Sequence, residues 1–142
     1  MYAKKLTVAR EALKSLEGID YPKDKVLMLG IGEVEIPDID FVEYQPGLRK
    51  NVLIHLLFDN TKDDPTGSDA ALIRYLPGAF VPRHLHLGYE MVLVLQGEYV
   101  ENDVLYRPGS LIIRAPGTTH EMRSSAGCTI LAMRDVPVQQ LT

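Results

Sequence analysis

The sequence has little cysteine and no long hydrophobic run. Cys128 is its one cysteine, so an internal disulfide is excluded and the chain suits a reducing compartment. No stretch is apolar and long enough to cross a bilayer, and the basic amino terminus lacks the apolar core and small-residue cleavage site of a secretion signal. We therefore expect a cytoplasmic protein with no membrane association.

Clusters of basic residues are also missing. The 15 lysines and arginines are outnumbered by 19 acidic residues, which gives a net charge of −4. Binding to a phosphate backbone requires a basic footprint, so we expect no nucleic-acid partner. The sequence also has no GxxxxGK[ST] loop and no Ser-His-Asp order, which leaves nucleotide-binding and hydrolase functions without support.

The length and composition indicate one globular domain. The 142 residues are 46% apolar and 24% charged, which is ordinary for a folded domain. No repeat or linker divides residues 1–142. We expect an amino-terminal helix and arm over residues 1–25, with the helix itself at 7–17, Thr7 as its N-cap and Gly18 as its end.

The rest of the chain has the pattern of an all-β protein. Turn residues separate short apolar runs, at 25–32, 40–47, 51–59, 71–78, 90–100, 103–116, 120–124 and 128–136. Strands at such intervals predict a sandwich or small barrel. The polar, acidic segment 59–69 is interpreted as a solvated hairpin connection.

Three of the four histidines are placed so that they could meet. In "PRHLHLGYE" (82–90), alternation along a strand puts His84 and His86 on one side, and Glu90 keeps the same parity. His120 follows a Pro-Gly turn at the head of another strand, where it could face the same point. Burying these groups without a cation would be costly, and imidazole and carboxylate are good ligands for transition metals.

Two other reactive residue types are interpreted as structural. In "NVLIHLLFD", His55 has the opposite parity from Val52, Ile54, Leu56 and Phe58, so we expect a structural or exposed residue. Cys128, before "TILAM", is interpreted as a small apolar residue of a strand. A redox-sensing thiol is the alternative for this position.

Two stretches resemble the motifs of the cupin superfamily. In residues 78–97 the first motif is matched at each defined position, by Gly78, His84, His86, Glu90 and Gly97. In residues 109–124 the second motif is matched by Gly109, Gly117 and His120. Ala115 replaces the family's proline, with Pro116 following it, and Ser124 replaces a frequent asparagine; neither position carries a metal ligand.

The flanks of the motifs resemble one subgroup. It comprises the cupin domain of ChrR-type anti-sigma factors and the small dioxygenases that cleave acetylacetone or dihydroxyacetophenone. The zinc-binding helical domain with which such anti-sigma factors hold their sigma factor has no counterpart in this sequence, so we do not expect regulation by that route. The resemblance implies an RmlC-like jelly roll, a double-stranded β-helix with metal inside its open end, and a homodimer.

The resemblance also implies a site and a function. His84, His86, Glu90 and His120 would bind one divalent transition metal, Fe²⁺ in the first instance, with Zn²⁺, Ni²⁺ or Mn²⁺ as alternatives; Glu90 could also serve as a catalytic base. Strand parity suggests apolar substrate contacts from Val92, Val94 and Met122. Tyr89, Arg114 and Arg74 are the polar candidates because they are near the ligands in sequence, and a structural or rim position is the alternative for each of these three. We expect an oxygenase acting on a small ketone, diketone or phenol. A metal-dependent isomerase or lyase and a non-catalytic sensing module are the alternatives.

Overall fold

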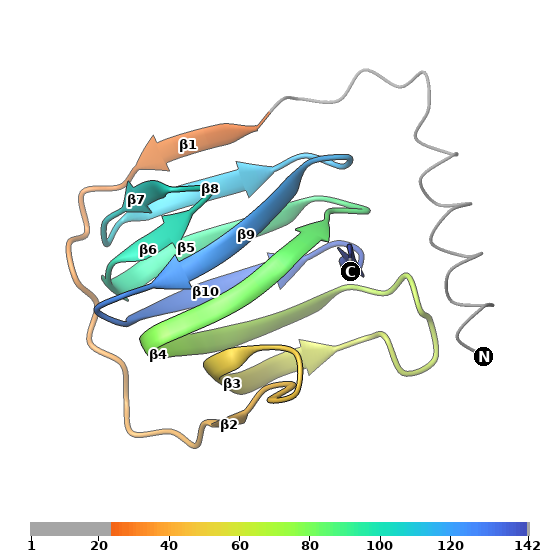
Figure 1. Ribbon diagram of the computed structural model, residues 1–142, viewed down its shortest axis with the longest axis horizontal. Helices are drawn as coiled ribbons and strands as arrows, with labels where there is room; N and C mark the ends of the chain where they lie inside the picture. The colour runs from red at the N-terminus through yellow and green to blue at the C-terminus, as the bar shows by residue number, and fades with distance from the viewer. Residues whose placement is uncertain (1–23, 142) are drawn as a thin grey trace.

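The computed structural model describes residues 24–141. The regular secondary structure in that part of the chain consists of strands, joined by turns and loops (Figure 1). The strands are β1 (Lys25–Met28), β2 (Val42–Glu43), β3 (Lys50–Asp59), β4 (Asp69–Leu85), β5 (Glu90–Gly97), β6 (Tyr99–Glu101), β7 (Val104–Tyr106), β8 (Ser110–Arg114), β9 (Thr119–Ser124), β10 (Cys128–Arg134) and β11 (Gln139–Gln140). The all-β prediction is confirmed. The helix predicted over residues 7–17 lies outside the described residues.

The antiparallel sheet curls so that its two ends form two layers (Figure 1). One layer has the order β1-β8-β5-β10-β4, continued by β3 and β2, and the other runs from β4 through β9 and β6 to β7. β4 belongs to both layers: its first part pairs with β3 and β10, and its last part pairs with β9 and β11. This arrangement is the double-stranded β-helix that the resemblance to cupins implies.

The bend of β4 differs from the sequence-based expectation. The Pro-Gly pair at residues 77 and 78 predicts the end of a strand, yet β4 continues through Gly78 to Leu85. Gly78 has φ of +81°, a left-handed conformation that glycine adopts without a Cβ clash. The chain therefore turns from one layer into the other inside a single strand. That turn carries the segment with His84 into the second layer.

A second motif glycine closes β5 against β10. Gly97 has φ of +74°, and a Cβ built on it would lie 2.2 Å from the carbonyl oxygen of Gly127. No side chain fits at that distance, so the close approach of the two backbones requires glycine. The strand that begins with Glu90 is thereby fixed at its far end.

The hydrophobic core lies between the two layers. Its buried members are Val52, Tyr75, Ala79, Val81, Val92, Val94, Tyr99, Ile112, Met122, Cys128 and Ile130. Cys128 is a buried strand residue, as predicted, and burial raises the pKa of its thiol to about 12. The thiol therefore stays protonated at neutral pH, which removes the property on which redox sensing depends.

The segment between β3 and β4 is a hairpin connection, as the sequence predicts. Asp59 and Asp69 are paired across the antiparallel strands at its base. Within residues 24–141, no helix has the length and apolar character needed to span a membrane.

Candidate metal centre

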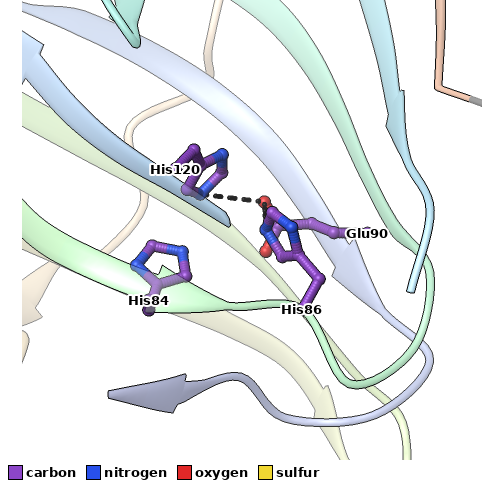
Figure 2. Close-up of side chains that lie close together, drawn as sticks. All are labelled: His84, His86, Glu90 and His120. Atoms are coloured by element: carbon purple, nitrogen blue, oxygen red, sulfur yellow. Dashed lines mark ion pairs between the residues drawn. The ribbon is translucent and has the colours of Figure 1, made fainter. Parts of the chain in front are cut away.

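Four buried side chains converge at one end of the double-stranded β-helix (Figure 2). His84 lies near the end of β4 and His86 follows that strand, while Glu90 begins β5 and His120 is the second residue of β9. The register pairs His84 directly with His120. One donor atom from each of the four residues lies within 4.8 Å of those of the other three. Strand alternation and antiparallel register thus bring together residues up to 36 positions apart in the chain.

Hydrogen bonds behind two of the rings fix which nitrogen faces the cluster. His84 Nδ1 lies 2.9 Å from the carbonyl oxygen of Pro82, which can only accept, so Nδ1 carries the proton. His86 Nδ1 lies 2.9 Å from the hydroxyl of Thr118. That hydroxyl donates to the carbonyl of Ala115 at 2.7 Å, so it accepts from His86. In the neutral tautomer that these bonds select, Nε2 of each ring is free of hydrogen and is the nitrogen available to a metal.

The third ring has an acidic neighbour instead. His120 Nδ1 lies 3.0 Å from Glu101 Oε1, and Glu101 is 1% exposed. Arg114 Nε and the hydroxyl of Tyr99 both donate to the Glu101 carboxylate. Burial opposes ionisation of Glu101, but its contacts with His120 and Arg114 hold its pKa below the usual range. Burial likewise lowers the pKa of His120, and the contact with Glu101 outweighs it and raises that pKa.

The charges inside the cluster suit metal binding. Glu90 Oε1 lies 3.5 Å from His86 Nε2 and 3.6 Å from His120 Nε2 (Figure 2). Burial alone would raise the pKa of Glu90, but the three histidines together lower it, so the carboxylate is ionised. Burial, with the neighbouring charge of His120, lowers the pKa of His84 to about 4. At neutral pH the cluster offers a carboxylate and a neutral His84 ring, the protonation states of metal ligands.

An unsatisfied nitrogen tests whether these residues fit a metal. His86 Nε2 is buried and has no hydrogen-bond partner among the described residues, although buried polar atoms are nearly always paired. A cation held by the four side chains would satisfy this atom and neutralise the carboxylate. The cluster could therefore hold a metal ion, and its mix of nitrogen and oxygen donors suits a divalent transition metal. Four protein ligands leave coordination positions open on an ion that accepts six.

The cluster opens onto a cavity of about 750 Å³ between the layers. His84, Glu90 and His120 all contribute to its wall. Much of the remaining wall is apolar, formed by Ala71, Ile73, Val81, Leu87, Met122 and Ile130 among others. The volume is in the range of small-molecule binding sites.

Of the three apolar residues proposed as substrate contacts, one lines the cavity and two do not. Met122 lies on the cavity wall, as strand parity predicts. Val92 and Val94 point inward, with exposures of 1% and 0%. They belong to the hydrophobic core and are not among the residues that line the cavity.

The polar candidates do not line the cavity. Arg114 pairs with Glu90 in register, but its side chain binds Glu101 and also Asp24. Tyr89 is half-buried in the segment before β5. Arg74 lies 4.1 Å from the centre of the Phe41 ring and lines a different, shallow depression.

His55 lies apart from the cluster formed by His84, His86, Glu90 and His120. Its Nδ1 is 2.7 Å from the carbonyl of Asp40, and its ring packs 6.0 Å from that of Phe41. Its structural role is as predicted.

Sequence reasoning missed four polar residues around the site. They are Arg49 and Tyr75 on the cavity wall, and Thr118 and Glu101 behind the rings. Thr118 could have been noticed from its place two residues before His120. Arg49 is 35 residues from His84 in sequence, and no local pattern marks it.

Comparison with known proteins places the fold in a defined family. The family described as the ChrR cupin-like domain matches residues 33–138. No protein with a curated description matches the sequence.

The solved structures with a similar fold carry names that describe different activities. An acetylacetone dioxygenase from Acinetobacter johnsonii aligns with a TM-score of 0.67 at 16% identity, over 87% of this chain and 85% of the other. The polyketide cyclase RemF from Streptomyces resistomycificus gives 0.59 at 20% identity, over 79% and 86%. The complex of Rhodobacter sphaeroides SigE with the anti-sigma ChrR gives 0.55 at 23% identity, over 68% of this chain and 49% of the other.

Proposed function

The chain belongs to the ChrR cupin-like domain family, and we propose that it is a metal-dependent oxygenase acting on a small ketone, diketone or phenol. The observation that carries the proposal is the joining of two features, the metal-binding cluster and the largely apolar cavity. His84, Glu90 and His120 lie on the cavity wall, so a molecule in the cavity would reach the metal directly. The name of the acetylacetone dioxygenase of similar fold supports this reaction class.

The side chains of the cluster would each have a defined role. His84, His86 and His120 would hold the ion through Nε2, with the Nδ1 atoms anchored by Pro82 and Thr118 for the first two rings. A bound Fe²⁺ ion would supply the redox chemistry that dioxygen requires.

Glu90 has the charge needed to act as either ligand or base. Its pKa is low, so its carboxylate is ionised and could bind the ion. The same low pKa gives it little affinity for a proton from the carbon between two carbonyl groups, so the ligand role is the better supported of the two. The apolar wall would exclude water from the reacting groups.

Oxygen consumption tests the proposal. Protein loaded with Fe²⁺ under anaerobic conditions is mixed with oxygenated buffer and a panel of β-diketones, hydroxyketones and phenols. We expect uptake of one O₂ per substrate consumed, with label from ¹⁸O₂ in the products by mass spectrometry. His86→Ala should abolish uptake, and His55→Ala, outside the cluster, should not. Absence of uptake with every compound would contradict the oxygenase.

Two alternatives would give different results in the same assay. A metal-dependent isomerase or lyase, favoured by the polyketide cyclase of similar fold, would convert substrate with Zn²⁺ and without O₂. A sensing module, favoured by the anti-sigma factor of similar fold, would bind a ligand and metal without turnover.

A further inference from the structure

Arg49 is a buried cation that lacks an acidic partner. It is 9% exposed and lines the same cavity as His84, Glu90 and His120. No carboxylate within residues 24–141 forms an ion pair with it. The other arginine on this wall, Arg134, is paired with Asp69. A buried charge is costly unless it is paired, so the unpaired guanidinium points to an anion that the cavity receives.

The contacts of Arg49 leave the end of its guanidinium free. Its Nε donates to Gln45 Oε1 at 2.9 Å, and its Cζ lies 4.9 Å from the centre of the Tyr44 ring. These contacts orient the planar group while neither Nη atom has a partner among the described residues. Two parallel N–H groups on one edge match the two oxygens of a carboxylate.

A second unpartnered donor lies on the same wall. Tyr75 is 6% exposed and lines the cavity, and its hydroxyl has no hydrogen-bond partner within the described part of the chain. Burial raises the pKa of this phenol. The charge of Arg49 lowers that pKa and the charge of Glu90 raises it, by smaller amounts than burial does. The phenol is thus a neutral donor within electrostatic reach of both the arginine and the metal-binding cluster.

Arg49 lies at a different place along the fold from the metal-binding cluster. Lys50, the next residue, is paired with Phe80 of β4, and His84 is four residues further along that strand. At about 3.3 Å per residue, the backbone at Phe80, beside Lys50, is at most about 13 Å from the backbone at His84. Apolar side chains, including Val81 and Met122, lie on the wall of the same cavity.

We propose that Arg49 binds a carboxylate of the substrate, so that the site takes a small organic anion with a metal-binding carbonyl or enol oxygen at one end and a carboxylate at the other. This inference rests on the proposed function, in that a small oxygenated compound occupies the cavity. It adds that the compound is anionic, with a short apolar segment between its two polar ends.

Binding of a matched pair of compounds tests the inference. Succinylacetone is a β-diketone with a carboxylate tail, and its methyl ester has the same diketone without the charge. Calorimetry uses the full chain loaded with Zn²⁺, which prevents oxidation of the ligand. We expect the wild type to bind succinylacetone about tenfold to hundredfold more tightly than the ester, the range for hydrogen bonds to a charged group.

The variants separate recognition from stability. Arg49→Gln should remove the preference for the anion while leaving ester affinity and zinc stoichiometry unchanged, and Arg49→Lys should keep part of the preference. Arg74→Gln is the matched control, because Arg74 also lies over an aromatic ring but outside the cavity. The inference is overturned if wild type binds neither compound or shows no preference, or if Arg49→Gln weakens both compounds equally.

Failure of the proposed function has a different signature. If Arg49 selects the anion but the Fe²⁺ protein consumes no O₂, the oxygenase is wrong and the anion site remains. If neutral diketones are oxidised equally well by wild type and Arg49→Gln, and succinylacetone gains nothing from Arg49, the oxygenase stands and the anion site does not.

Discussion

Thr118 shows how a single hydroxyl can set the tautomer of a histidine in the candidate metal centre. Its proton goes to the Ala115 carbonyl, so its oxygen must accept from His86 Nδ1. Thr118→Val keeps the shape of the side chain but removes that acceptor, and the ring loses the bond that fixes its tautomer. We expect metal affinity to fall about tenfold or more, measured by competition for Zn²⁺ with a chromophoric chelator.

A neighbouring threonine supplies the control. Thr119 accepts from Arg83 on the exposed side of β9 and contacts no ring of the cluster. Thr119→Val should therefore leave Zn²⁺ affinity within about twofold of wild type, because exposed hydrogen bonds contribute little. Equal effects of the two substitutions would mean that the Thr118 hydroxyl does not position His86.

Residues differ in how well the sequence reveals them. His84, His86, Glu90 and His120 could be grouped in advance because alternation along strands, with motif spacing, decides their direction. Arg49 could not, because its meeting with the cluster depends on the pairing of β3 with β4, which brings distant segments together. Arg114 is near the cluster in sequence and could contact substrate or be structural; its side chain binds the buried carboxylate of Glu101, which agrees with the structural alternative.

The strands as elements were largely predictable, and their bends were not. Apolar runs marked the strands, because a strand that faces a core needs them. A Pro-Gly pair ordinarily ends a strand, and only the structure shows that Gly78 bends β4 between two layers. The bend depends on partners for both halves of the strand, which are separate segments of the chain.

The junction of β5 and β10 should be intolerant of any side chain. Gly97→Ala would place a Cβ 2.2 Å from a backbone oxygen at a φ of +74°. Gly117 has φ of +90° with nothing within 4 Å of the added Cβ. We expect Gly117→Ala to cost about 1–2 kcal/mol from backbone strain alone and Gly97→Ala at least about 2 kcal/mol more, by urea unfolding. Equal costs would show that the backbones at Gly97 can separate freely.

Because of Cys128, the free energy of unfolding should decrease as the pH rises in the alkaline range. The thiol has a pKa of about 12 in the fold against an ordinary value of 9.0, so the folded state keeps its proton after the unfolded chain has lost it. The stabilising contribution is complete below pH 9 and is lost as pH rises from 9 toward 12. Relative to Cys128→Ala, wild type should lose up to about 1.4 kcal/mol per pH unit in this window.

Urea unfolding at several pH values measures this difference. Using the difference between the two proteins removes the contributions of the other groups that titrate in the same range. Parallel curves for wild type and Cys128→Ala would show that the thiol ionises freely in the fold.

The four residues of the candidate metal centre meet only when the whole chain is folded. The cluster joins β4, β5 and β9, which are assembled from both layers of the sheet. No local segment of the chain holds all four side chains, so the unfolded chain has no comparable site. The homodimer expected from the sequence stays a prediction, which light scattering on the intact protein can check.

Binding of metal to the folded state alone must stabilise it. With Zn²⁺ at about 100 times its Kd, the gain is about 2.7 kcal/mol, which for a chain of this size raises the Tm by roughly 8 °C. A chelator should reverse the shift, and the double variant His84→Ala/His86→Ala should show none. His55→Ala is the control for histidine loss, because His55 contacts Asp40 and Phe41 instead of the cluster. A Zn²⁺-dependent rise of the same size in the double variant would mean that the ion binds elsewhere, since the loss of two of the four ligands must weaken a site built from all of them.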